Sequence, residues 1–299
     1  MGEQTINWSA WKLAIRPRTL PAAASGVIMG SALAWHDGVF RFDATLICLA
    51  AALLLQIGSN LANDVFDFER GADTPNRQGP TRVTQAGLLS PTQVKLGMWI
   101  VFALAALLGL YLALLGGWPI LVVGAAAIVS AIAYTGGPFP LGYYGLGDLF
   151  VFLFFGLASV AGTYYVQAGS ISAAAWWMTI PPGLIITGIL VVNNLRDLED
   201  DRKAGKHTLA VVFGERGAKI QYLICLAVGY LALPIAAAFG LLPRLSLTAW
   251  LSLPIAIRAA SVVLTQKGRA LNAALAATGQ AALAFSLLFW VGLMLARVV

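Results

Sequence analysis

The stretch NNLRDLEDDRKAGKHT, residues 193–208, follows an apolar run that extends without a break from 176 to 192. Four acidic and four basic residues therefore gather where a membrane-spanning helix would end. Asp197 and Asp201 are four residues apart, so on a helix they share one face, and Asn193 lies on that face one turn earlier. Two carboxylates this close repel each other unless positive charge lies between them. A divalent cation with oxygen ligands fits such a site, although a solvated loop would have the same composition.

The stretch QIGSNLANDVFD, residues 56–67, also ends an apolar run, and Asp73 follows it closely. Polar groups on a membrane helix are costly in lipid and are expected to face a bundle interior or a wet cavity. The polar side chains here are spaced so that they form one stripe along a helix, which consists of Gln56, Asn60, Asn63, Asp64 and Asp67.

The two acidic stretches share the spacing Asn-x-x-x-Asp, at residues 63–67 and 193–197. The basic residues that follow them are Arg77, Arg82 and Lys206. Magnesium commonly shares carboxylate ligands with substrate phosphates. Two acidic helix ends that face each other would hold Mg2+, and the trailing cations would help to neutralise a diphosphate. The pair of stretches is therefore more specific than either one alone.

The composition is that of an integral membrane protein. The chain has 299 residues, of which 59% are hydrophobic and 11% charged, and its mean hydropathy is +0.81. Soluble domains carry about a quarter charged residues. The net charge of +6 is spread over loops, so it does not indicate a nucleic-acid partner. We expect one polytopic domain over residues 1–299.

Nine apolar runs are long enough to cross a bilayer, which takes about 20 residues. We place them at 19–36, 44–63, 94–115, 118–135, 147–168, 174–193, 219–240, 246–264 and 271–296. With the N-terminus inside, fifteen of the nineteen Lys and Arg residues fall on the inner side. The positive-inside rule then places the N-terminus and both acidic stretches in the cytoplasm.

The residues Asn63-Asp64-x-x-Asp67 with Asp73, and Asp197-x-x-x-Asp201, resemble the two aspartate-rich motifs of the UbiA-type superfamily of intramembrane prenyltransferases. Segments 77–87, 134–148 and 193–209 are more specifically similar to its 1,4-dihydroxy-2-naphthoate polyprenyltransferase branch. The similarity runs from residue 16 to the last predicted span. The sequence departs from the usual pattern twice: residue 71 is glycine where a third aspartate is usual, and no basic residue follows the tyrosine at 134.

The resemblance implies an all-α membrane fold of about nine transmembrane helices around a central cavity. It also implies Mg2+-dependent transfer of a polyprenyl group from polyprenyl diphosphate to 1,4-dihydroxy-2-naphthoate. Carbon dioxide and diphosphate would leave, and demethylmenaquinol would form for menaquinone biosynthesis. The expected location is the plasma or inner cell membrane, with the lipid bilayer as partner.

The resemblance also assigns roles to residues. The metal ligands would be Asn63, Asp64, Asp67, Asp73, Asn193, Asp197 and Asp201. Five of these would be catalytic, namely Asn63, Asp67, Asp73, Asp197 and Asp201. The diphosphate would be held by Arg77, Arg82 and Lys206. The aromatic residues Phe150, Phe152 and Phe154 are expected to wall the cavity and keep water from an allylic cation.

Other functions stay open from the sequence. The same fold could act on another acceptor, such as 4-hydroxybenzoate, haem, chlorophyllide or a glycerol phosphate. A CDP-alcohol phosphotransferase also binds Mg2+ through intramembrane aspartates, but its single Asp-rich helix is not found here. A secondary transporter with an inverted repeat is an alternative of a different class, but its site would lie at the membrane midplane.

Overall fold

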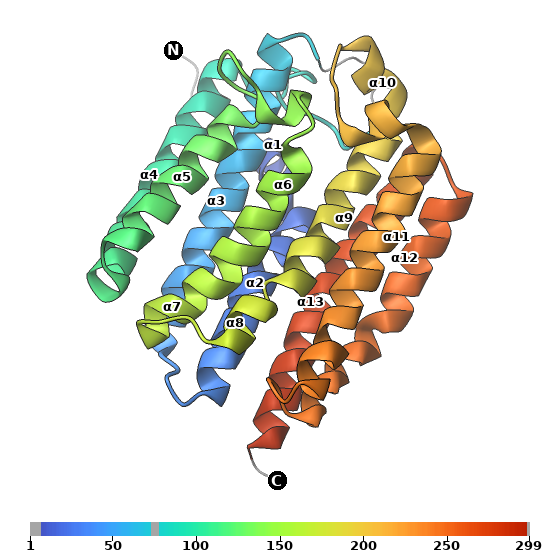
Figure 1. The fold of residues 1–299 in the computed structure, drawn as a ribbon. Coiled ribbons are helices and arrows are strands. Elements are labelled where there is room, and N and C mark those ends of the chain that lie inside the picture. The colour runs from blue at the N-terminus through green and yellow to red at the C-terminus, as the bar shows by residue number, and fades with distance from the viewer. Residues whose placement is uncertain (1–6, 73–77, 298–299) are drawn as a thin grey trace.

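The computed structural model describes residues 7–72 and 78–297, and over these ranges the chain is helical without strands. Figure 1 shows the long helices running side by side. The α-helices are α1 (Trp8–Ile15), α2 (Leu20–His36), α3 (Phe42–Glu69), α4 (Pro91–Gly116), α5 (Trp118–Ala133), α6 (Gly147–Val151), α7 (Gly162–Ala168), α8 (Ala173–Trp177), α9 (Ile180–Arg196), α10 (Leu198–Lys203), α11 (Leu209–Ala238), α12 (Leu253–Thr265) and α13 (Leu271–Ala296). The other helical segments are η1 (Pro17–Thr19), η2 (Leu141–Tyr143), η3 (Phe152–Ala161), η4 (Arg244–Ser252) and η5 (Gly268–Ala270).

In the described part of the chain, seven helical stretches are long and apolar enough to cross a membrane. They are Phe42–Glu69, Pro91–Gly116, Gly147–Ala168, Ala173–Arg196, Leu209–Ala238, Arg244–Thr265 and Gly268–Ala296. The two remaining predicted runs coincide with shorter helices, α2 and α5. The chain is therefore a multi-pass membrane protein, and each predicted run overlaps a helix.

The helices differ from the prediction in several places. Helix α3 continues to Glu69, six residues past the predicted end, so the first acidic stretch lies on a helix throughout. Helix α11 begins at Leu209, well before the predicted start, and bends at Gly214, whose φ is 71°. The run 147–168 is not one α-helix, because η3 is a π-helix of ten residues between α6 and α7.

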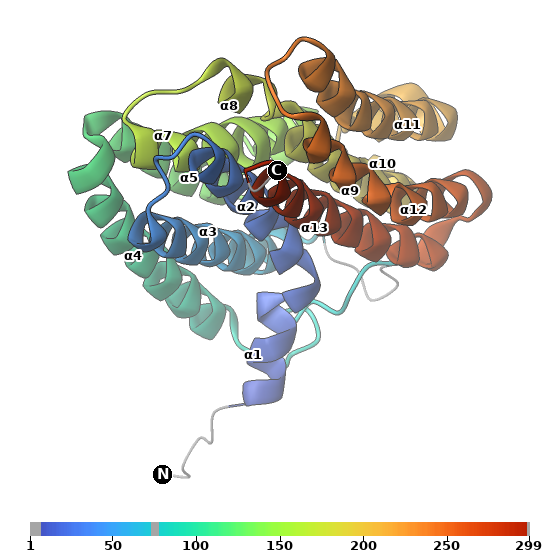
Figure 2. The ribbon, with the colours of Figure 1, turned by 90° about the horizontal axis from the view of Figure 1, so that it is seen from below.

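The packing of α2 against η3 explains two of its glycines. A Cβ atom added at Gly26 would lie 2.4 Å from the Ser159 hydroxyl, and one added at Gly30 would lie 2.4 Å from the Val160 carbonyl oxygen. Only glycine allows this close approach of the two backbones. In Figures 1 and 2, α3, α4 and α5 lie on one side of the molecule and α11 and α12 on the other, with α2, α9 and α13 between them.

The two acidic stretches lie at the same end of the bundle. In Figure 1 this is the upper end, where the segment after α3 and helix α10 are both seen. Helix α1 is at this end, whereas α13 finishes at the opposite end. The two acidic stretches must lie at the same end if both are to contribute ligands to one metal site.

Candidate active site

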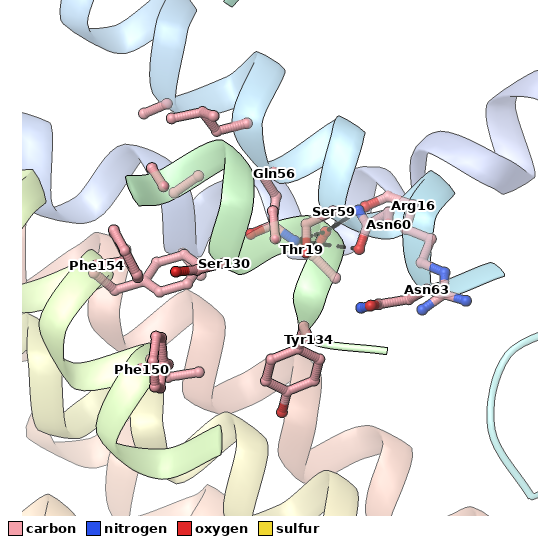
Figure 3. A pocket seen from close by; sticks show the side chains of 18 of the residues that line it. Arg16, Thr19, Gln56, Ser59, Asn60, Asn63, Ser130, Tyr134, Phe150 and Phe154 are labelled. Atoms are coloured by element: carbon pink, nitrogen blue, oxygen red, sulfur yellow. Dashed lines mark hydrogen bonds between the residues drawn. The ribbon is translucent and has the colours of Figure 1, made fainter. Parts of the chain in front are cut away.

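A cavity of about 1460 Å³ runs into the bundle from the end that carries the acidic stretches. Its mouth is bordered by polar residues from both stretches, including Asn63, Asp67, Asn193, Asp197 and Asp201. Farther in, its wall consists mainly of alanine, glycine and aliphatic side chains. Figure 3 shows Phe150, Phe154 and Tyr134 in the same pocket as the polar side chains Gln56, Ser59, Asn60 and Asn63 of α3. Phe150 and Phe154 border the cavity as expected, whereas Phe152 packs against Gly183 of α9.

Asp67 lies near the end of α3 and is 5% exposed. Its carboxylate accepts a hydrogen bond from the Arg82 guanidinium at 2.9 Å and another from the Tyr143 hydroxyl at 3.1 Å. One turn earlier, the side-chain oxygen of Asn63 accepts a hydrogen bond from Thr135 at 3.0 Å. The first acidic stretch is thus tied to two loops, those after α3 and after α5.

Asp64 has a different environment from its neighbours. It is 1% exposed, and its two carboxylate oxygens accept hydrogen bonds from the backbone amides of Val83 and Thr84, each at 3.0 Å. Asp64 is absent from the residues that border the cavity, unlike Asn63 and Asp67. Its carboxylate therefore holds the segment that begins with Arg82 in place.

The second acidic stretch is organised by Arg196, whose side chain is 1% exposed. The guanidinium donates to both carboxylate oxygens of Asp197, at 2.8 and 2.5 Å, and to the side-chain oxygen of Asn193 at 2.5 Å. It also donates to Asn272 of α13 at 2.7 Å. A forked arginine of this kind fixes a carboxylate in orientation as well as in charge.

Asp201 follows Asp197 by one turn, since its amide donates to the Asp197 carbonyl at 2.8 Å. The Lys206 ammonium pairs with its carboxylate at 3.1 Å. Burial raises the pKa of Asp201 above its ordinary range; Lys206 opposes this shift, while the charges of Asp197 and Asp67 add to it. Asp67, on another helix, borders the same cavity as Asp201.

Tyr143 connects the two stretches directly. Its hydroxyl donates to Asp67, and the Lys206 ammonium lies over its ring, 4.7 Å from the centroid. The amide of His207 donates to the Tyr143 carbonyl at 2.7 Å, which fixes the loop against the second stretch. The loop after α5 thus holds the two acidic segments facing one another.

Two of the predicted site residues, Asp73 and Arg77, lie outside the described residues. The structure brings together Asn63, Asp67, Arg82, Asn193, Asp197, Asp201 and Lys206 at the cavity mouth. No site role was expected from the sequence for Arg196 or Asn272. The only available signal for Arg196 was an arginine at the end of an apolar run, a position that membrane topology also explains.

The donor set at the mouth suits a hard cation. Carboxylate and amide oxygens are the ligands that Mg2+ prefers. Three or more His, Cys, Asp or Glu side chains close enough to hold an ion together are not found within residues 7–72 and 78–297. The carboxylates are instead paired with Arg82, Arg196 and Lys206. Asn63, Asp67, Asn193, Asp197 and Asp201 all border the same cavity mouth, so the oxygen donors present there fit an added cation.

A model of the UbiA prenyltransferase family matches residues 23–278. The chain belongs to this family. The 1,4-dihydroxy-2-naphthoate octaprenyltransferase of Escherichia coli (strain K12) is 39% identical over 308 residues, which cover 99% of each chain. The protein of the same name from Mycobacterium tuberculosis (strain ATCC 25618 / H37Rv) is 39% identical, over 94% of this chain and 95% of that one. The UbiA family membership expected from the sequence is confirmed, and the protein is a prenyltransferase.

Solved structures of UbiA homologs share the fold. The apo structure of a UbiA homolog from Aeropyrum pernix K1 superimposes with a TM-score of 0.72 at 16% identity, covering 94% of this chain and 99% of that chain. A UbiA homolog from Archaeoglobus fulgidus bound to DMAPP and Mg2+ gives a TM-score of 0.66 at 15% identity, covering 95% and 99%. The UbiA-type helical architecture predicted from the sequence is confirmed by these likenesses.

Proposed function

We propose that this protein transfers a polyprenyl group from polyprenyl diphosphate to 1,4-dihydroxy-2-naphthoate, with loss of CO2 and diphosphate, giving demethylmenaquinol. The observation that carries the proposal is the chain of contacts from Asp67 through Tyr143 and Lys206 to Asp201 at the mouth of a deep apolar cavity. Support for this acceptor comes from similarity over nearly the whole chain to proteins named 1,4-dihydroxy-2-naphthoate octaprenyltransferase.

We assign metal binding to the oxygen donors at the mouth, namely Asn63, Asp67, Asn193, Asp197 and Asp201, together with Asp73. A UbiA homolog of the same fold has been solved with Mg2+ and GPP, which supports a magnesium requirement. Bound magnesium would supply positive charge that stabilises the departing diphosphate. We assign Asp64 the role of positioning the segment that carries Arg82, because its oxygens are occupied by backbone amides.

Arg82, Lys206 and Arg77 are the proposed diphosphate-binding residues. Arg82 is paired with the carboxylate of Asp67, and Lys206 with that of Asp201. A diphosphate that entered with cations would compete for these basic groups and free the carboxylates for the metal. Charge-assisted hydrogen bonds of this type are stronger than neutral ones, so they suit the charge that develops on the leaving group.

The atoms and electrons of the proposed reaction balance without a separate general base. The allylic carbon–oxygen bond breaks, and its electron pair leaves with the diphosphate. The ring carbon that bears the carboxylate forms the new carbon–carbon bond. The bond to the carboxylate then breaks, CO2 departs, and its electron pair restores the aromatic ring. Phe150 and Phe154 would keep water from the allylic cation during these steps.

We further propose that the cavity mouth opens to the cytoplasm from the plasma or inner membrane. The support is the excess of Lys and Arg on the segments at this end of the helices. Labelling of single cysteines introduced on the α10 segment and at the opposite end, in intact and in opened cells, would test this orientation.

The acceptor can be tested with purified protein, octaprenyl diphosphate and Mg2+, by mass spectrometry of the products. The expected result is a decarboxylated prenyl naphthoquinol from 1,4-dihydroxy-2-naphthoate and little product from 4-hydroxybenzoate. Preferential prenylation of 4-hydroxybenzoate would move the protein to another branch of the family. Absence of product with every acceptor would reject the proposed function.

A further inference from the structure

The cavity ends in a single layer of side chains at the end remote from the acidic residues. On five helices, the residues that border the cavity stop at this layer, which consists of Val27 of α2, Cys48 of α3, Leu112 of α4, Ile120 of α5 and Val166 of α7. All five are buried and belong to one hydrophobic cluster. We refer to these five residues as the cavity floor.

The floor lies deep in the bundle. Cys48 and Asp67 are nineteen residues apart on α3, which at 1.5 Å per residue is about 28 Å. The hydrocarbon core of a bilayer is about 30 Å thick. An apolar chain anchored at the mouth therefore has almost the whole thickness of the membrane in which to extend before it meets the floor.

One helical turn before the floor, the cavity wall changes to glycine on three helices. Gly109 precedes Leu112 by three residues, Gly124 follows Ile120 by four, and Gly162 precedes Val166 by four. Residues at these spacings lie on the same face of a helix. All three glycines border the cavity. They therefore form a wide section directly above the floor, which we call the glycine section.

The glycine section is not explained by helix packing. A Cβ atom added at Gly109, Gly124 or Gly162 would meet no atom within 4 Å, in contrast to Gly26 and Gly30. Nor does the backbone require glycine, because none of the three has a positive φ. Glycine inside a helix is less stable than alanine. The free volume at these positions thus belongs to the cavity, and a larger side chain would fill it.

The cavity also reaches the outer surface of the bundle at this level. Leu110, Leu121 and Val123 border the cavity, yet they are 55%, 44% and 38% exposed. These residues are direct neighbours of Gly109, Ile120 and Gly124 in the sequence. A chain that reached the floor would find an exit toward lipid beside α4 and α5, which Figure 1 shows at the left edge of the molecule.

We propose that Gly109, Gly124 and Gly162 determine which donor lengths the enzyme uses, by giving a long prenyl chain room to bend over the floor and pass into the bilayer. This inference rests on the proposed prenyl transfer. Ala52, one turn above Cys48, lies fifteen residues from Asp67 on α3, or about 22 Å from it. A geranyl chain held by its diphosphate at the mouth ends well before this level, whereas an octaprenyl chain passes it.

The test compares octaprenyl and geranyl diphosphate as donors for the same purified variants. Phenylalanine is introduced at Gly109 and at Gly124, with Gly109→Ala and Gly124→Ala as small-residue controls. Ala103→Leu serves as the control for added bulk on α4, because residue 103 is exposed and does not border the cavity. The ratio of kcat/KM for octaprenyl to kcat/KM for geranyl diphosphate is measured for each.

We expect Gly109→Phe and Gly124→Phe to lower this ratio by about tenfold or more. One methylene group in a fitted site already changes the selectivity between two substrates this much, and a phenyl ring in the substrate channel should have at least the same effect. The alanine variants and Ala103→Leu should keep the wild-type ratio. Activity with geranyl diphosphate also reports that each variant is folded. An unchanged ratio, or an equal loss with both donors, would overturn the proposal. Failure of the proposed function would be seen separately, as wild-type protein inactive with both donors.

Discussion

The hydroxyl of Tyr143 donates a hydrogen bond to the carboxylate of Asp67 at 3.1 Å, and this contact joins the loop after α5 to the end of α3. The same ring supports the Lys206 ammonium, which is paired with Asp201. Tyr143 therefore sets the relative position of the two acidic stretches. Loss of this single hydroxyl tests whether their alignment matters for activity.

Tyr143→Phe keeps the ring under Lys206 and removes the hydroxyl that donates to Asp67. We expect the Mg2+ concentration for half-maximal activity to rise roughly fivefold, the equivalent of about one hydrogen bond. Tyr144→Phe is the matched control, because Tyr144 is half exposed and its ring stacks on Phe139. Equal magnesium requirements in the two variants would show that Tyr143 does not align the site.

Arg196→Ala is expected to destabilise the protein by about 3–5 kcal/mol, because it leaves the Asp197 carboxylate without its buried partner. Removing both charges, in Arg196→Ala with Asp197→Ala, should recover much of the lost stability. The measurement is thermal unfolding in detergent for the two single variants and the double variant. Simple addition of the two single effects would mean that the pair is not coupled as the structure indicates.

Asp64→Asn is expected to lower the unfolding temperature even without magnesium, since the carboxylate accepts two backbone hydrogen bonds in the interior. Hydrogen bonds to a charged group contribute about 1.5–3 kcal/mol each. The segment after residue 78 should become more open to limited proteolysis. If Asp64→Asn instead matched wild type in EDTA and differed only in its response to magnesium, a role as a ligand would be favoured.

The pH dependence of stability should reflect Asp201. Burial raises the pKa of this carboxyl in the folded chain, so the folded state holds the proton more tightly than the unfolded state. Its stabilising contribution is fully present below the unfolded pKa and is lost as the pH rises through the raised pKa. In EDTA, Asp201→Asn should therefore flatten the fall in unfolding temperature over this range. A wild-type pH profile in Asp201→Asn would contradict the assignment.

Much of the site could be predicted because spacing on a helix fixes which side chains share a face. The residues Asp67, Asp197 and Asp201 were identified in this way, and the structure brings them to one cavity mouth. Spacing could not show that Asp64 and Asp67 have different roles, since both lie on the polar stripe. Their difference depends on the backbone amides of residues 83 and 84, which a distant loop supplies.

The remaining differences have physical causes that a pattern does not contain. The positive-inside rule also explains an arginine at position 196. Its role in the site becomes clear only from its hydrogen bond to Asn272 on the last helix. The predicted end of α3, at residue 63, is too early because an apolar run ends at the first charged residue, whereas the helix does not. The helix continues through the polar residues, since the cavity gives their side chains a polar environment within the bundle, and the chain turns only at Gly71, with φ of 68°.

The most direct test of the central claim is the magnesium dependence of prenyl transfer by purified wild-type protein, Asp67→Asn and Asp43→Asn. Asp43 is the control because it lies on the first turn of the same helix, α3, and its side chain is 45% exposed. We predict that EDTA abolishes product formation in wild type, that Asp67→Asn lowers turnover at least about a hundredfold at any magnesium concentration, and that Asp43→Asn behaves as wild type. Full turnover in EDTA, or near-wild-type turnover by Asp67→Asn, would contradict the account.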